Sequence, residues 1–161
     1  MIAYIASLRL FLIRSSFFYF IIFFLMIDYL INFPFFFIGI PEEMASNLPL
    51  EQIKGYDLGF QIMLVIFIGP LMETFIFQYT IIKLVRILIH DPNIKFFLAI
   101  ILSASAFSIS HYYNIYYFLF GITSGFILAV AFYIAIYRKE PAFLTIFLIH
   151  SIWNSIAFIT N

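Results

Sequence analysis

Four polar side chains lie in stretches of sequence that are otherwise built from Phe, Ile, Leu and Val, namely Glu73, His111, His150 and Asn154. A carboxylate and an imidazole can together activate a water molecule, and an imidazole and an amide can donate hydrogen bonds to a developing negative charge. His150 and Asn154 are four residues apart, so on a helix they share one face, one turn apart. An ionisable side chain is costly in such surroundings, which makes each of these residues a functional candidate.

The spacing of Glu73 and His111 predicts that the two side chains meet. The segment that contains Glu73 ends in "HDPN", and Pro92 lies midway between Glu73 and His111 in the sequence. If two straight helices run antiparallel from that turn, both residues reach the same depth, roughly 28 Å from the turn at about 1.5 Å per residue. His150 and Asn154, counted from the turn at 138–140, are predicted to be somewhat shallower, with Asn154 the nearer of the two.

The composition indicates that these residues belong to membrane helices. The chain of 161 residues is 65% hydrophobic and 10% charged, which is more apolar surface than a soluble domain of this size could bury. Most segments are apolar on all sides, as is typical of helices surrounded by lipid or by other helices. There is no cysteine, so disulfides, thiolate nucleophiles and cysteine metal sites are excluded. We therefore predict an all-α, polytopic membrane helix bundle.

Five apolar segments come close to the length of about 20 residues that a membrane-spanning helix requires. They run over 10–33, 58–85, 96–112, 115–137 and 141–159, and Gly69-Pro70 interrupts the second. That interruption predicts a helix that is partly re-entrant, because irregular backbone is tolerated at depth where protein or water covers it. We divide the chain into an N-terminal membrane helix with an acidic loop (1–57) and a core of about four membrane helices (58–161). The loop at 41–57 could hold one short interfacial helix.

The charged residues predict the orientation of the bundle, because Lys and Arg mark the inner side of a membrane. They precede the first segment (Arg9, Arg14), follow the second (Lys83, Arg86, Lys95) and separate the last two (Arg138, Lys139), whereas Glu42, Glu43, Glu51 and Asp57 make the loop after the first segment acidic. This alternation predicts an inner N-terminus and an outer C-terminus. The wealth of Phe, Ile and Tyr over Ala indicates an AT-rich genome, so we expect a multi-pass protein of a bacterial cell membrane.

Two further polar residues lie within the apolar segments. Asp28 lies about a turn and a half before Pro34, which predicts a position at the membrane interface. Gly121 and Gly125 have the spacing that lets helix backbones approach closely, and we interpret them as packing residues. Gln78 is the second polar residue, and it lies within the first of three motifs.

The sequence resembles the type II CAAX prenyl endopeptidase and bacteriocin-processing family of membrane proteases, also called CPBP or Abi proteins, which are metalloprotease-like glutamic peptidases. The family has a first motif EExxxR after an apolar stretch with a proline, a second motif FxxxH and a third motif HxxxN or HxxxD. Here "GPLMETFIFQ" stands at the first motif, "FSISH" matches the second and "HSIWN" matches the third. A glycine-containing helix, "FLFGITSGFILAV", lies between the second and third motifs, as in the family, and the resemblance covers about residues 60–160.

The first motif departs from the family pattern at two positions. Glu73 matches the first Glu, but Thr74 replaces the second Glu and Gln78 replaces the Arg. The two lost residues would pair with each other, so their joint replacement leaves neither charge without a partner. The Glu, His, His, Asn set is intact.

The resemblance implies an intramembrane endopeptidase. Glu73, with His111, would activate a water molecule as general base, and His150 and Asn154 would stabilise the oxyanion that forms on the scissile carbonyl. The substrate would be a membrane-associated peptide or a lipidated protein. We expect the lipid bilayer and such a substrate as partners, with no nucleic acid and no cofactor.

Two alternative chemistries remain open. Glu73, His111 and His150 are competent zinc ligands, so a divalent metal such as zinc could serve the site, although the spacing HExxH is missing. A serine peptidase could use Ser124 with His150, since "TSG" resembles the rhomboid GxSG motif, but Ile122 stands where that motif has Gly.

Two functions outside the peptidase class also fit the sequence. A non-catalytic or weakly catalytic membrane immunity protein, such as a bacteriocin self-immunity factor, would keep the same helix core, and the altered first motif favours it. A small transporter is the least favoured function, because internal repeats or paired broken helices would be expected and only one break is evident.

Overall fold

The computed structural model describes residues 2–34 and 49–160, and these residues form helices joined by short turns, with no strand among them. The elements in chain order are α1 (Ile2–Arg14), α2 (Phe17–Asn32), α5 (Pro49–Ile53), α6 (Leu58–Ile62), η1 (Met63–Ile68), α7 (Gly69–Glu73), η2 (Thr74–Thr80), α8 (Ile81–Leu88), α9 (Pro92–Ser110), α10 (Ile115–Ala135) and α11 (Ala142–Thr160). The predicted all-α helix bundle is therefore confirmed. Glu42 and Glu43 of the predicted acidic loop lie outside the described residues.

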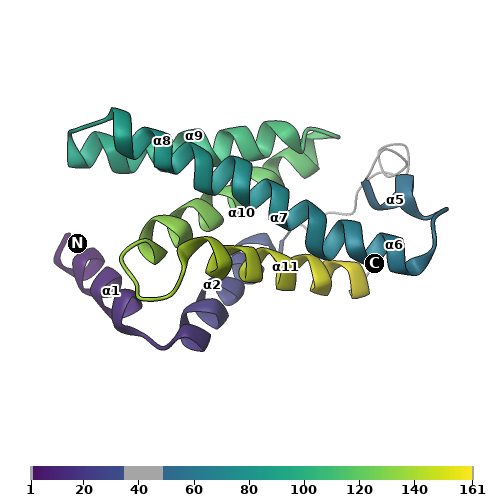
Figure 1. Ribbon diagram of the computed structural model, residues 1–161, viewed down its shortest axis with the longest axis horizontal. Helices are drawn as coiled ribbons and strands as arrows, with labels where there is room; N and C mark the ends of the chain where they lie inside the picture. The colour runs from purple at the N-terminus through teal and green to yellow at the C-terminus, as the bar shows by residue number, and fades with distance from the viewer. Residues whose placement is uncertain (1, 35–48, 161) are drawn as a thin grey trace.

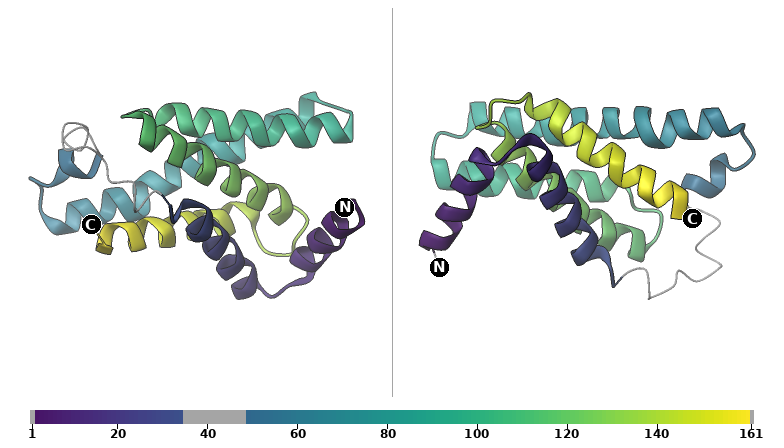
Figure 2. Two further views of the ribbon diagram at one scale, coloured as in Figure 1. Left: turned by 180° about the vertical axis from the view of Figure 1, so that it is seen from behind. Right: turned by 90° about the horizontal axis from the view of Figure 1, so that it is seen from below.

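Four helices of the described residues are long and apolar enough to cross a membrane, at Leu58–Leu88, Pro92–Ser110, Ile115–Ala135 and Ala142–Thr160, and α2 is a shorter apolar helix. Figure 1 shows the long helix from α6 to α8 lying antiparallel to α9. Helices α10 and α11 lie below this pair in the view, and α1 and α2 form a corner at the lower left. The C-terminal end of α11 lies beside α6 and η1 in all three views (Figures 1 and 2), and α11 contacts η1.

The predicted first span over 10–33 is wrong in one respect, because two helices meet there at a sharp corner. Ser16 caps α2, with its side chain accepting a hydrogen bond from the N–H of Tyr19, and the hydroxyl of Ser15 donates to the carbonyl of Leu12. Serine side chains compete in this way with the backbone bonds of a helix, which makes the pair a natural break.

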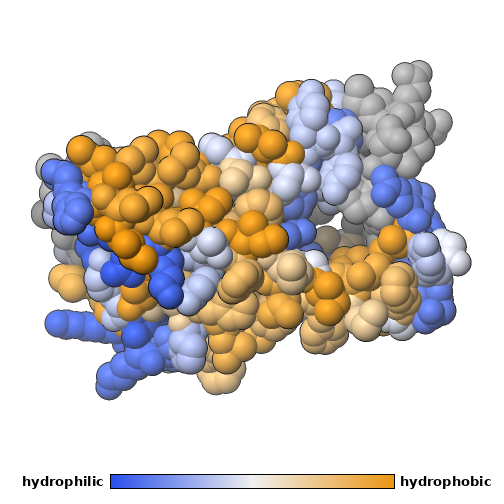
Figure 3. Space-filling model, turned by 45° about the horizontal axis from the view of Figure 1, so that its top comes forward, coloured by the Kyte–Doolittle hydropathy of each residue, from blue (hydrophilic) through white to orange (hydrophobic). Residues whose placement is uncertain are grey.

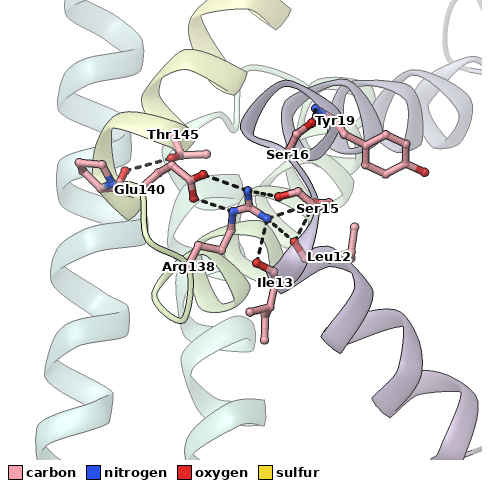
Figure 4. Close-up of polar contacts among 9 residues, drawn as sticks. Leu12, Ile13, Ser15, Ser16, Tyr19, Arg138, Glu140 and Thr145 are labelled. Atoms are coloured by element: carbon pink, nitrogen blue, oxygen red, sulfur yellow. Dashed lines mark hydrogen bonds and ion pairs between the residues drawn. The ribbon is translucent and has the colours of Figure 1, made fainter.

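Arg138 holds this corner from the turn between α10 and α11 (Figure 4). Its guanidinium, which is 1% exposed, donates to the carbonyls of Leu12, Ile13 and Ser15 and pairs with Glu140. It also lies over the ring of Phe20, 4.4 Å from the centroid. A cation at the C-terminus of a helix satisfies carbonyls that have no donor within that helix. Arg138 thereby fixes α1 and α2 to the rest of the bundle.

The helix that carries Glu73 continues through Gly69-Pro70 without a break. π-Helical turns lie on both sides of the proline, in η1 and in η2. A proline removes one backbone donor and its ring crowds the carbonyl four residues earlier, so a locally wider helix accommodates it. The predicted re-entrant helix is therefore wrong, because one continuous helix runs over Leu58–Leu88 and departs from α-helical geometry only by its π-helical turns. Glu73 lies between the two π-helical segments.

The glycines of α10 bring that helix close to α9. A Cβ on Gly121 would lie 3.2 Å from the Cα of Ser108 and 3.4 Å from the Cβ of His111, and one on Gly125 would lie 2.9 Å from a ring carbon of Phe107. The packing role predicted for the two glycines is confirmed. Their close approach also fixes the end of α9 where His111 lies.

Polar residues gather at the two ends of the molecule and apolar residues cover most of the surface between them (Figure 3). At one end, Arg9 and Arg86 both lie over the ring of Tyr137, at 4.7 and 5.6 Å from its centroid. The basic groups before the first span, after the second span and before the last span therefore meet at one end of the bundle. That arrangement is the one the predicted inner N-terminus requires.

Candidate active site

Glu73, His111 and His150 come from three different helices and meet at one point. The Oε1 atom of Glu73 lies 3.7 Å from Nε2 of His111, and Oε2 lies 3.3 Å from Nε2 of His150. The predicted meeting of Glu73 and His111 is confirmed, because α8 ends at Leu88 and α9 starts at Pro92, as the equal spacing requires. His150 is as close to the carboxylate as His111 is, so the two pairs predicted at different depths form one cluster.

The cluster lines a cavity of about 300 Å³, and Asn154 lines the same cavity. The rest of the wall is mainly apolar and aromatic, with Leu64, Phe107, Tyr117, Phe120 and Trp153 among its residues. The side chain of His150 is 4% exposed and that of Glu73 is 27% exposed, so Glu73 is the more accessible of the two. The described lining contains no Lys or Arg. Polar interactions in such a low-dielectric wall are stronger than in water.

The ring of His111 is oriented by the backbone of its own helix. Its Nδ1 lies 2.7 Å from the carbonyl oxygen of Phe107, and because a carbonyl only accepts, Nδ1 carries the proton in this contact. The neutral ring therefore presents an unprotonated Nε2 to Glu73. The separation of 3.7 Å is longer than a hydrogen bond, and a shared water molecule is the natural bridge between the two groups.

The ring of His150 has a different partner. Its Nδ1 lies 3.5 Å from the hydroxyl of Thr74, and its ring meets Phe107 edge to face, with the centroids 5.6 Å apart. Thr74 is fully buried. A neutral His150 whose Nδ1 accepts from that hydroxyl would carry its proton on Nε2, where it can donate into the cavity.

Asn154 reaches the cavity from the next turn of α11. Among the described residues, no hydrogen bond joins it to either histidine. Its Nδ2 donates to the carbonyl of Val65, at 3.0 Å. The amide has a second N–H, which this contact leaves available. The residue is thus oriented by the backbone of η1 and can still donate towards a bound group.

Tyr113, in the turn that follows His111, also lines the cavity. Its ring meets that of His111 edge to face. Burial, together with the negative charge of Glu73, raises the pKa of its hydroxyl above the ordinary value of tyrosine. The hydroxyl therefore stays protonated near neutral pH and can act as a hydrogen-bond donor.

Comparison with protein-family models assigns the sequence to a family. The model "Rce1-like: Type II CAAX prenyl endopeptidase Rce1-like" matches residues 56–156, well over half of the chain. The protein belongs to this family. Searches of curated proteins and of solved structures found no match. The resemblance seen in the three motifs is therefore confirmed, and a membrane protease is the kind of function that the family supports.

The two positions where this family member departs from the first motif are both buried. Thr74 contacts His150, so the position of the second Glu still supports the site, with a hydroxyl in place of a carboxylate. Gln78, at the position of the Arg, is fully buried, and neither of its amide atoms has a hydrogen-bond partner among the described residues. The joint replacement of Glu and Arg by Thr74 and Gln78 thus leaves no charge unpaired, as predicted, but it leaves the buried amide of Gln78 without a partner among the described residues.

Asp28 is the residue of this region that the sequence placed wrongly. It is 5% exposed and lines the same cavity as Glu73, instead of lying at an exposed interface. Asn32 donates to it at 3.1 Å and to Ser124 of α10 at 3.0 Å. A carboxylate in an apolar segment with Asn four residues later was the available signal for a buried polar contact.

The geometry bears on both alternative chemistries. The ring nitrogens of His150 face Thr74 and Glu73, and no hydrogen bond joins His150 to Ser124 in the described part of the chain. The pairing of nucleophile and base that a serine peptidase needs is therefore not formed. Among the described residues, no group of three or more His, Cys, Asp or Glu side chains was found to be arranged for holding a metal ion.

Proposed function

We propose that the protein is an intramembrane endopeptidase that cleaves a membrane-associated or lipidated peptide with a water molecule activated by Glu73. The observation that carries the proposal is the meeting of one carboxylate with two imidazole Nε2 atoms, one at each carboxylate oxygen, in a largely apolar cavity. A carboxylate with an imidazole acceptor beside it is suited to take a proton from water.

In the proposed reaction, Glu73 and His111 take a proton from the water molecule as its oxygen bonds to the scissile carbonyl carbon. The negative charge that forms on the carbonyl oxygen accepts hydrogen bonds from Nε2–H of His150 and from the second amide N–H of Asn154. The proton then passes to the nitrogen of the departing amine as the C–N bond breaks, and a carboxylic acid and an amine leave the site. Because side chains alone activate the water molecule in this reaction, cleavage is predicted to persist in the presence of a metal chelator.

The surroundings of the site support a substrate that is itself in or on a membrane. The cavity wall is mainly apolar and aromatic and lies among helices that are long enough to span a bilayer. A peptide with apolar side chains or a lipid chain can enter such a site without losing favourable hydration. We propose the membrane of a bacterial cell as its location.

The proposal is tested by peptide cleavage in membranes that contain the protein, followed by mass spectrometry. We expect cleavage products of candidate lipidated and membrane-active peptides with the wild type and none with Glu73→Gln, which keeps the shape of the side chain but removes its basicity. Glu51→Gln changes an exposed acid of α5 and should cleave as the wild type does. Equal cleavage by wild type and Glu73→Gln would contradict the proposal.

A second candidate is a membrane immunity protein that protects its host against a bacteriocin by binding. The observation that favours it is the altered first motif, in which Gln78 is buried with no hydrogen-bond partner among the described residues. Expression in a host that is challenged with membrane-active peptides separates the two candidates. Protection by Glu73→Gln as strong as that by the wild type, without cleavage, would favour the immunity protein.

A further inference from the structure

We propose that Ser151 is a positioning residue of the site, and that Ser151 and Asn154 supply donors to the two carbonyls that would compete for the N–H missing at Pro70 in the Glu73 helix. This pair of contacts, which we call the proline lock, holds α11 against η1 and so keeps His150 beside Glu73. Its kinetic consequence rests on the proposed function, whereas its structural consequence does not.

Pro70 lacks one backbone N–H, which either of two carbonyls would accept, depending on the helical pattern. In an α-helix the carbonyl of Ile66 accepts from the N–H of residue 70, and proline has none. In the π-helical pattern of η1, the N–H of Gly69 bonds to the carbonyl of Leu64. The next bond of that pattern would run from residue 70 to the carbonyl of Val65. Because that single N–H is absent, at least one of the two carbonyls needs a donor from elsewhere if it is not to lie unpaired in an apolar environment.

Helix α11 supplies both donors. The hydroxyl of Ser151 donates to the carbonyl of Ile66 at 2.6 Å, and Nδ2 of Asn154 donates to the carbonyl of Val65 at 3.0 Å. The two side chains are three residues apart and so lie on the same face of α11. Two adjacent donors on one helix thus match two adjacent acceptors on the other.

The lock is next to the site on both helices. Ser151 follows His150 directly, and Glu73 lies three residues after Pro70. A shift of α11 relative to η1 would therefore change the distance of 3.3 Å between Nε2 of His150 and Oε2 of Glu73. It would also turn the second N–H of Asn154 away from its place in the cavity wall. Ser151 touches none of the proposed reacting atoms and acts only through these neighbours.

The structural arm of the test uses Trp153 as a probe. It is the only tryptophan of the chain, it is 7% exposed, and it stacks on Phe120 in the cavity wall. We expect Ser151→Ala to shift the fluorescence of the purified protein in detergent towards longer wavelength and to lower the melting temperature. Ser155→Ala is the matched control, because the hydroxyl of Ser155 donates to a carbonyl of its own helix, that of Ser151, and to no other group of the described residues.

The decisive comparison is a double-mutant cycle with Pro70→Ala, which supplies an N–H at residue 70 in a residue of high helix propensity. If the lock replaces the missing backbone bond, the effect of Ser151→Ala on fluorescence and melting is much smaller in the Pro70→Ala background. An equal effect of Ser151→Ala in both backgrounds would overturn the proposal. A fluorescence response to Ser151→Ala no larger than that to Ser155→Ala would overturn it as well, and this second comparison does not require Pro70→Ala to fold.

The kinetic arm measures kcat and KM for peptide cleavage. We expect Ser151→Ala to lower kcat by about 10- to 100-fold with little change in KM, because a small misplacement of reacting groups costs rate more than binding. Ser155→Ala should leave both constants unchanged. A wild type that cleaves no peptide would refute the proposed function, and the fluorescence cycle would still decide on the lock. Cleavage by Ser151→Ala at the wild-type kcat would refute the positioning role.

Discussion

At the scale of single residues, the two histidines face the same carboxylate but are held in different ways. The Nδ1–H of His111 is bound to a backbone carbonyl of its own helix, which leaves Nε2 as an acceptor. The Nδ1 of His150 faces a side-chain hydroxyl, which allows Nε2 to donate. The same residue type can thus serve as the base and as the oxyanion donor, because the partner of Nδ1 determines which nitrogen carries the proton.

This difference predicts the effect of removing the proposed oxyanion donor. His150→Ala should lower kcat by about 10²- to 10³-fold with a smaller change in KM, since the lost hydrogen bond forms mainly in the transition state. His90, a residue of the turn before α9, provides the control, and His90→Ala should retain wild-type kinetics. An effect of His150→Ala that falls only on KM would assign His150 to substrate binding instead. Steady-state kinetics with a cleaved peptide make this measurement.

At the scale of helices, the close contact of α9 with α10 sets the position of His111. Phe107 is central to it, because its ring packs on α10 while its carbonyl orients the imidazole. Two glycines make this contact possible, because a methyl group at either position would crowd atoms of α9.

The contact predicts that a larger residue in place of either glycine lowers the stability of the protein. In Gly125→Ala the new Cβ would lie 2.9 Å from the ring of Phe107 and 3.2 Å from the carbonyl of Ala104. We expect destabilisation by about 1–3 kcal/mol from overpacking, with a lower melting temperature in detergent and slower cleavage. Gly55→Ala, where nothing lies within 4 Å of the added Cβ, should unfold like the wild type. Equal melting temperatures of the two variants would contradict the packing argument.

At the scale of the whole molecule, Arg9 and Arg86 meet at one end while the site lies towards the other. The cavity wall includes Ile53 of α5 and Tyr113 of the turn after α9, and neither lies at the end where Arg9 and Arg86 meet on Tyr137. With an inner N-terminus, the site would therefore be nearer to the outer surface.

The absence of cysteine makes this orientation directly measurable. In intact cells, a membrane-impermeant thiol reagent should label Tyr56→Cys, in the turn before α6, and should fail to label Lys139→Cys, in the turn before α11. Both variants should react after the cells are permeabilised. The opposite pattern of labelling would show that the bundle is inverted and that the site faces the cytoplasm.

The parts of the structure that follow from local sequence were predictable. The turn at Pro92, the start of a helix at Ile115 and the equal spacing of Glu73 and His111 depend on turns and helix rise alone. The sharp corner at Ser15–Ser16 was not predicted, although Arg14, Ser15 and Ser16 interrupt the apolar run, because the residue that stabilises it, Arg138, is distant in sequence. For the same reason the pairing of Asp28 with α10 could not be read from the chain.

The details of the site were predictable only in part. The residue types indicated four site residues, Glu73, His111, His150 and Asn154. The first three of them do meet. The hydrogen bond from Asn154 to Val65 could not be foreseen, because hydropathy does not reveal which carbonyls a proline leaves without a donor in a helix with π-turns. The catalytic roles of the four residues remain predictions.

The central claim, that Glu73 activates water for peptide cleavage, is tested most directly by single-turnover cleavage with the purified protein in lipid nanodiscs, free of host peptidases. The measurement compares the wild type with Glu73→Gln on one peptide that the wild type cleaves, in the presence and absence of a chelator. The account predicts a loss of at least about 10³-fold with Glu73→Gln and no effect of the chelator, since the loss of a base leaves water unactivated. Cleavage by Glu73→Gln within about tenfold of the wild-type rate would contradict it.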